Sequence, residues 1–215
     1  MRKTLFLLAL AAAPLGAQAV TKDSPDPDKN VAGAALPAGW TGRTDRPTQQ
    51  LANAKFVTMG NGFHVTTGPA AVFWNPKNRA VGTYTLRATF SQAAPSQHPE
   101  AYGVFFAGKN LDQPDQDYMY FLVRQNGQFM IKHRAGAETH TIVDWTAHPA
   151  IKQVAAGGPA AVNALEVAVG DKNISFKVNG QEVHSLAKPG PADGIYGLRV
   201  NHNLDVHVTS FGVNR

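Results

Sequence analysis

The chain has 215 residues, no cysteine, and 20 Lys and Arg against 15 Asp and Glu, which gives a formal net charge of +5. The lack of cysteine excludes a disulfide framework and any thiolate metal site. A chain of this length fits one domain, with a core large enough to fold without covalent cross-links.

The first residues predict an export signal. Arg2 and Lys3 precede an apolar run over 5–13, and Ala17-Gln18-Ala19 has the pattern of a signal-peptidase site. The run is too short to span a bilayer. We therefore expect residues 1–19 to be removed and the protein to be exported to the periplasm or the extracellular space, without membrane insertion. Taking Arg2 and Lys3 from the 20 basic side chains leaves 18 against 15 acidic ones, a small excess.

Residues 20–38 contain prolines among small and charged residues, so we expect an extended, poorly ordered lead-in. A single domain over 39–215 follows, in which short alternating segments separated by turn residues predict strands. The segments 55–59 and 62–67 predict a first hairpin. The strand predicted over 70–74 should end at Asn75-Pro76, because proline has no N–H to donate to a sheet.

The segment 101–134 predicts a strand, an acidic loop and a hairpin closed by Asn126-Gly127, a pair typical of two-residue turns. Such a turn places Gln125 opposite Gln128. In that register one face is apolar and the other is polar and aromatic. The apolar face would carry Met119, Phe121, Val123 and Met130, and the other face Tyr118, Tyr120, Arg124 and His133.

A second hairpin is predicted over 173–186, closed by Asn179-Gly180, and its register places Lys177 opposite Glu182. Strands over 194–200 and 204–213 complete the set, the last with a bulge near Thr209-Ser210. About eleven to thirteen short strands with almost no helix predict an all-β fold, a two-sheet antiparallel jelly-roll sandwich.

Several runs carry a family resemblance. NALEVAVGDKNISFKVNGQEVHSL and DGIYGLRVNHNLDVHVTSFGV resemble the C-terminal half of concanavalin A-like jelly rolls, and LPAGWTGRTD, GFHVTTGPAAVFWNP and GTYTLRATF are similar to their opening strands. The resemblance is closest to the 3-keto-disaccharide hydrolase (DUF1080) and laminin-G-like domains, and it implies a carbohydrate-engaging fold. The hydrolase group often has Gly-Leu-Gln-x-His near its end. Here Arg199 replaces the Gln and His202 comes one residue late, so activity does not transfer with the fold.

One predicted face suits a sugar. Tyr118, Tyr120, Arg124 and His133 share it, and we expect Trp145 beside them. Aromatic rings offer flat apolar surfaces with a polar edge, and Arg and His add hydrogen-bond donors. The alternative is that this face packs against the second sheet, with the tyrosine hydroxyls bonded at its rim.

Motifs for known catalytic mechanisms are missing. The four glutamates do not show the E-x-D-x-E spacing of laminarinase-type glucanases, whose mechanism needs a carboxylate pair. There is also no G-x-S-x-G, H-E-x-x-H or phosphate-binding loop. If the protein is an enzyme, the candidate acid–base residues are Asp144, His133 and His202.

No cofactor is predicted. The loop with Asp112, Asp115 and Asp117 offers the oxygen ligands that calcium takes, but acidic runs are usually solvated. Residues 132–134 form the only dense basic cluster, too little for a nucleic-acid partner. The sequence therefore predicts an exported carbohydrate-engaging domain that binds glycans. A hydrolase of 3-keto-disaccharides or glycosides is the alternative, and a non-catalytic protein-interaction domain is a further one.

Overall fold

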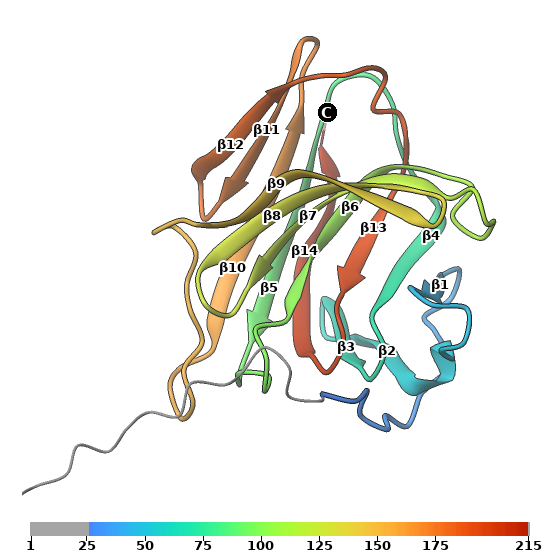
Figure 1. Cartoon of the computed structure of the whole chain (residues 1–215), viewed down its shortest axis with the longest axis vertical. Helices are drawn as coiled ribbons and strands as arrows, with labels where there is room; N and C mark the ends of the chain where they lie inside the picture. The colour runs from blue at the N-terminus through green and yellow to red at the C-terminus, as the bar shows by residue number, and fades with distance from the viewer. Residues whose placement is uncertain (1–25, 215) are drawn as a thin grey trace, which may run out of the picture.

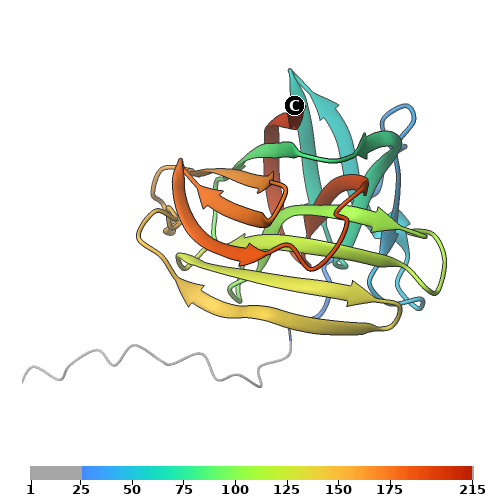
Figure 2. The same cartoon turned by 90° about the horizontal axis from the view of Figure 1, so that it is seen from above.

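The computed structural model describes residues 26–214, so the predicted signal over 1–19 lies outside the described residues. The described chain forms fourteen strands and one short 3-10 helix, η1 (Leu51–Asn53). The strands build two antiparallel sheets of seven strands each (Figures 1 and 2). This confirms the predicted all-β jelly-roll sandwich. No helix among the described residues is long and apolar enough to cross a membrane.

Strands distant in sequence lie side by side in both sheets. Sheet A has the spatial order β1 (Thr41–Thr44), β4 (Ala71–Ala80), β13 (Gly194–Val200), β6 (Ala101–Lys109), β7 (Asp117–Arg124), β8 (Gln128–Ala135) and β9 (Glu138–Ala147). Sheet B has the order β12 (Gln181–Ala187), β11 (Asn173–Val178), β10 (Ala161–Val169), β5 (Tyr84–Gln92), β14 (Asp205–Asn214), β3 (Gly62–Thr67) and β2 (Ala54–Met59).

The main core lies between the inner faces of the two sheets. Along β5 and β10 every second side chain is buried, as the alternating sequence predicts. Phe121 on β7 packs against Phe176 on β11, with ring centroids 5.2 Å apart. Each fully buried side chain of this size contributes about 1.5–3 kcal/mol.

A second apolar cluster lies on the face of sheet A that points away from sheet B, here called the outer face. Its buried members include Phe105, Tyr118 and Leu122, which are 0–1 % exposed although sheet B packs on the opposite side. In Figure 1, β8 and β9 run across the view while β4 and β13 run steeply, so sheet A is strongly twisted and bent. Large side chains on the inside of such a bend bury one another.

The two Asn-Gly hairpins differ in their turns. At Asn179-Gly180 both residues have positive φ, 50° and 81°, and Lys177 lies opposite Glu182 as predicted. At the other hairpin only Gly127 has positive φ, and Arg124 pairs with Gln128. That loop therefore has three residues, and the predicted register of β8 is wrong by one position.

Long-range contacts explain the longer loop. The side-chain oxygen of Gln125 accepts hydrogen bonds from the backbone N–H of Ser96, at 2.7 Å, and from its hydroxyl, at 2.9 Å. The Gln125 carbonyl accepts a bond from the Val154 N–H. Gln125 is thus held outside the β7–β8 ladder. A shift of one residue moves every side chain of β8 to the other face of the sheet.

Strand β4 continues through Pro76, so the predicted end at Asn75-Pro76 is wrong. Its pairs with β1 end at Trp74, and its pairs with β13 jump from Trp74 to Arg79. Pro76 therefore lies at a position of β4 that has no paired residue on β1 or β13, so its missing N–H costs no sheet hydrogen bond. The bulge predicted near Thr209-Ser210 is confirmed by the register shift between Thr209 and Gly212.

We predict that Asn179→Ala destabilises the fold by about 2–4 kcal/mol, because the positive φ and each of the partly buried side-chain hydrogen bonds contribute about 1 kcal/mol. Its side chain bonds Ala150, Asn163 and Ala164. Asn126→Ala should change stability by less than about 0.5 kcal/mol. Urea unfolding measures both, and equal effects would contradict this account of the two turns.

Candidate functional site

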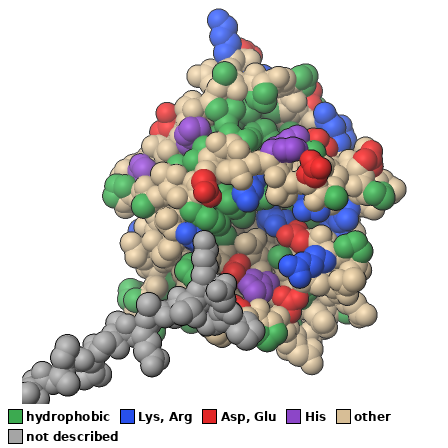
Figure 3. All heavy atoms as spheres, viewed as in Figure 1, with side chains coloured by type: hydrophobic (Ala, Val, Ile, Leu, Met, Phe, Trp, Pro, Cys, Tyr) green, Lys and Arg blue, Asp and Glu red, His purple; other side chains and the backbone are tan. Residues whose placement is uncertain are grey.

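The outer face of sheet A gathers polar and aromatic side chains from strands that are far apart in sequence. Directly paired residues share a face, so the pairs Tyr120–Lys132 and Tyr118–Arg134 place both cations beside the tyrosines. Arg43 joins them from β1, opposite Val72 of the same face. Figure 3 shows Lys and Arg side chains gathered below the arch of β8 and β9, with acidic side chains and histidine next to them.

The floor of this face contains an ion pair between Arg199 on β13 and Asp45, which follows β1. The two nitrogens of Arg199 lie 2.8 and 2.6 Å from the two oxygens of Asp45, a bidentate arrangement. The Arg199 guanidinium also lies 4.7 Å from the centre of the Tyr120 ring. Its side chain is 8 % exposed, so this is a buried pair.

The ion pair sets the charge states of its members. Burial alone would raise the pKa of Asp45, but the Arg199 guanidinium, with Arg134 and Arg43 further away, holds it below its usual range. Burial alone would lower the pKa of Arg199, and the Asp45 carboxylate raises it instead. Both groups are therefore charged throughout the neutral range.

A second contact lies at the open edge of the face. The Arg124 guanidinium stacks over the Trp145 ring at 4.1 Å, and its Nε donates to Gln128 at 2.9 Å. Burial lowers the pKa of Arg124, while the charges of Asp144 and Glu100 oppose that shift. Trp145 is half-buried, which leaves part of its ring accessible.

The structure thus brings together four of the five predicted sugar-binding residues: Tyr118, Tyr120, Arg124 and Trp145. The two tyrosines are 1 % and 3 % exposed, so they form the floor of the face and do not reach solvent. Burial raises the pKa of both hydroxyls. The accessible groups are Arg124, Trp145 and the cations around them.

His133 is the exception, because the register error placed it on the wrong face. It pairs with Met119, whose side chain belongs to the main core, so His133 points to the inner side of sheet A. Its Nε2 lies 3.0 Å from Asp117. There it lines a hollow of about 400 Å³ together with Met119, His140 and Ile142.

The three candidate acid–base residues do not converge. Asp144 is exposed on β9 and accepts a hydrogen bond from the Trp145 N–H at 2.8 Å. His133 lies on the opposite side of sheet A. His202 lies in the β13–β14 connection, with Glu100 at 2.8 Å, Asp28 at 3.3 Å and Asp26 at 3.7 Å. The hydrogen bond to Glu100 raises the pKa of His202.

Two features of the structure were not predicted from the sequence: the contacts of the N-terminal segment with the sandwich and the ion pair between Arg199 and Asp45. Of the lead-in predicted over 20–38, residues 20–25 lie outside the described residues, and residues 26–38 have no regular secondary structure. Asn203 donates a hydrogen bond to Asp26, and its side-chain oxygen accepts one from the Lys29 N–H. Arg199 was visible as a departure from the Gly-Leu-Gln-x-His run, but its partner Asp45, at the end of the LPAGWTGRTD run, carried no signal of a pairing with it.

The acidic loop does not form one cluster of ligands. Asp115 accepts a hydrogen bond from Asn110 at 2.8 Å, and Asp117 pairs with His133. In residues 26–214, the group of acidic and histidine side chains with closely spaced ligand atoms is Asp26, Glu100 and His202.

Comparison with known proteins supports the fold. No family model matches the chain, and no curated protein matches its sequence. Among solved structures, the carbohydrate-binding module CBM66 from Bacillus subtilis aligns over 86 % of this chain and 99 % of its own, with 9 % identity and a TM-score of 0.61. A B. subtilis protein of unknown function with a galectin-like fold gives 14 % identity, 81 % and 88 % coverage, and a TM-score of 0.59.

A family 16 glycoside hydrolase, an endo-glucanase from Bacteroides ovatus, aligns over 79 % of this chain and 92 % of its own, with 10 % identity and a TM-score of 0.54. At these identities the likeness concerns the fold alone. The chain therefore has the jelly-roll fold of the concanavalin A-like type. The narrower resemblance to 3-keto-disaccharide hydrolase domains stays a prediction.

We predict that Arg199→Met lowers the free energy of unfolding by about 3 kcal/mol, because it leaves the Asp45 carboxylate half-buried and unpaired. The double variant with Asp45→Asn should recover part of this loss. Urea unfolding of the two single variants and the double variant gives the coupling, and additive losses would contradict a direct pair.

The same pair predicts a pH dependence. The pKa of Asp45 is lower in the folded protein than its ordinary value of 3.8, so the pair stabilises the fold above that pH. This stability is lost as the pH falls from about 3.8 through the folded-state pKa. Stability curves between about pH 2 and 6 should therefore be flatter for Asp45→Asn than for the unchanged protein. Parallel curves would show that Asp45 makes no such contribution.

Proposed function

We propose that this protein is an exported carbohydrate-binding domain that binds acidic glycans along the outer face of sheet A. The observation that carries the proposal is a set of cations without salt bridges in residues 26–214, beside a partly exposed aromatic ring. Arg43, Arg124, Lys132 and Arg134 share the face, and none of them makes a salt bridge with another residue of the described chain.

The aromatic part of the face suits a sugar ring. Trp145 presents a flat apolar surface, and the stacked Arg124 guanidinium holds that surface in place. Gln128 and Arg124 add hydrogen-bonding groups next to it. The fold is shared with a carbohydrate-binding module and an endo-glucanase, which supports a sugar as the ligand class.

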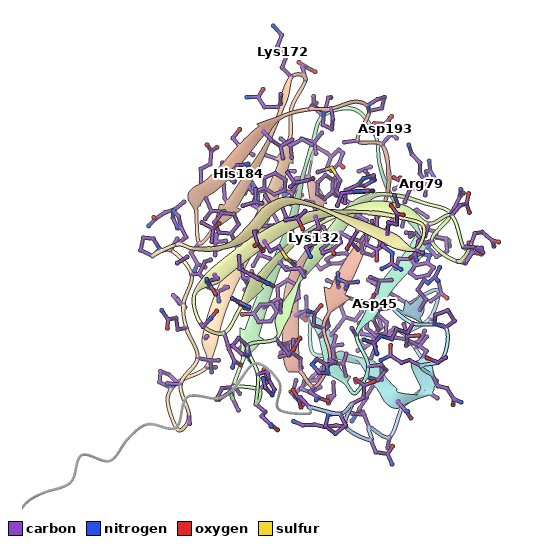
Figure 4. All side chains as sticks on the ribbon, in the orientation of Figure 1. Asp45, Arg79, Lys132, Lys172, His184 and Asp193 are labelled. Carbon is purple, nitrogen blue, oxygen red and sulfur yellow. The ribbon has the colours of Figure 1, made fainter. Side chains whose placement is uncertain are left out.

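The charges favour sugars that carry carboxylate or sulfate groups. Lys132 lies near the middle of the face, whereas Asp45 lies lower and is bound to Arg199 (Figure 4). The backbone carbonyls of Leu111 and Gln113 accept bonds from Arg43. These carbonyls position the cation without cancelling its charge. Hydrogen bonds between guanidinium or ammonium groups and an anion are about twice as strong as neutral ones.

The carboxylates favour binding over glycoside hydrolysis. A glycosidase needs two carboxyl groups that flank the bond to be cut, one of them free to give a proton. On the outer face Asp45 is held ionised by Arg199, and Asp144 is exposed at the rim beside Trp145. Export is supported by the signal pattern over 1–19.

We predict that a trimer of uronic acid binds, and that its carboxyl-methylated form binds at least tenfold more weakly, because methylation removes the charges but keeps the rings. Arg124→Ala and Lys132→Ala should each weaken binding of the acidic trimer about tenfold, or about 1.4 kcal/mol. Trp145→Ala should weaken both forms. Isothermal titration calorimetry with a panel of uronate and neutral oligosaccharides measures these differences.

Lys172→Ala is the matched control. It removes the same charge from an exposed turn between β10 and β11, far from the outer face (Figure 4). It should leave affinity unchanged. If Lys172→Ala and Lys132→Ala weakened binding of the acidic trimer equally, the loss would follow from the net charge of the protein, and the proposed site would be wrong. Binding to no sugar of the panel would contradict the function and favour a protein-interaction domain.

A further inference from the structure

We infer that Asp26, Glu100 and His202 form a binding site for a divalent metal ion. The three residues come from the N-terminal segment, the residue before β6 and the β13–β14 connection. One ligand atom from each lies within 4.8 Å of the others. The inference does not depend on the proposed glycan-binding function.

The spacing of the ligand atoms suits an ion. Nε2 of His202 lies 2.8 Å from Oε1 of Glu100 and 3.7 Å from Oδ2 of Asp26. Atoms bound about 2.1 Å from a common metal ion are about 3.4 Å apart in a tetrahedral site and about 3.0 Å apart for neighbouring ligands of an octahedral site. The ion would replace the proton that otherwise joins His202 to Glu100, with only small movements of the side chains.

Two outer contacts orient the ligands, as they do around bound metals. Nδ1 of His202 lies 3.3 Å from Asp28, which leaves Nε2 for the ion in the usual carboxylate–histidine–metal arrangement. Oδ1 of Asp26 accepts a hydrogen bond from the buried Asn203 at 2.9 Å. The other oxygen of Asp26 is buried and accepts no hydrogen bond from the described residues. That oxygen faces His202.

The net negative charge of the cluster also favours binding of a cation. Three carboxylates, from Asp26, Asp28 and Glu100, surround one imidazole, and each has its salt bridge with His202 rather than with a Lys or Arg of the described chain. Even a protonated His202 leaves the group with a net negative charge. One imidazole nitrogen and two carboxylate oxygens are a ligand set for Zn²⁺ or Mn²⁺.

Such an ion would fasten the N-terminal segment to the sandwich. Asp26 belongs to a segment without regular secondary structure, whereas Glu100 and His202 lie next to strands of sheet A. A hollow of about 320 Å³ adjoins the cluster and is lined by Asp26, Asp45 and His202, among others. Because Asp45 is also the partner of Arg199, the metal site would lie beside the lower end of the outer face.

The test is metal content and metal-dependent stability of the purified protein. We expect about one equivalent of Zn²⁺ or Mn²⁺ by mass spectrometry, a melting temperature lowered by chelator and restored by the metal, and faster tryptic cleavage at Lys29 after chelation. Asp26→Asn, which keeps the acceptor for Asn203, and Glu100→Gln should each reduce metal affinity at least tenfold. Ca²⁺ should restore little.

His64→Gln is the matched control, since the His64 side chain is 25 % exposed like that of His202 and lies 3.1 Å from a single carboxylate, Asp205. It should bind metal like the unchanged protein. Sub-stoichiometric metal with no shift in melting temperature would overturn the inference and make the cluster a protonated histidine among carboxylates. Metal binding that survives in both Asp26→Asn and Glu100→Gln would overturn it as well.

Discussion

The buried ion pair between Arg199 and Asp45 is the interaction on which the outer face depends. A guanidinium that is 8 % exposed needs a fixed carboxylate, and Asp45 supplies both oxygens. The pair joins the end of β1 to β13 and holds the guanidinium over the Tyr120 ring, where it also donates a hydrogen bond to the Tyr118 hydroxyl. The pair thereby fixes the position of the two tyrosines, over which the other cations of the outer face lie.

Bending of sheet A turns this floor into a surface that a ligand can use. The large side chains on the inside of the bend bury one another, which leaves long polar side chains and Trp145 as the accessible layer. The cations in that layer are held by neutral partners: Arg124 by Gln128, Arg43 by backbone carbonyls and Arg134 by the Gly136 carbonyl. Their charges remain available to an anionic ligand because none of the three forms a salt bridge within residues 26–214.

The sequence was informative where local chemistry decides the structure. Asn179-Gly180 sits between alternating strands with an opposite-charge pair across them, and all three signals agree on one register. Asn126-Gly127 carries the same dipeptide, but Ser96, 29 residues before Gln125 in the chain, holds the Gln125 side chain and lengthens the loop. Such a contact leaves no mark on the local pattern, and the resulting slip is why His133 was expected on the wrong face.

In the candidate site, too, features that depend on local sequence could be predicted, whereas features that depend on long-range pairing could not. Tyr118, Tyr120 and Arg124 alternate along one strand, so their common face could be predicted from sequence alone. Asp45 and Asp26 lie in segments without periodicity, and their partners Arg199 and His202 are more than 150 residues further along the chain. Pairing over such distances depends on the order of strands in the sheets, which a single sequence does not reveal.

The most direct test of the central claim is hydrogen–deuterium exchange of the protein with and without a saturating acidic oligosaccharide. We expect slower exchange in β7, β8 and β9, around Arg124, Lys132 and Trp145, with sheet B unchanged. Protection confined to the hollow that His133 lines between the sheets, or to sheet B, would contradict the claim that the outer face of sheet A is the binding surface.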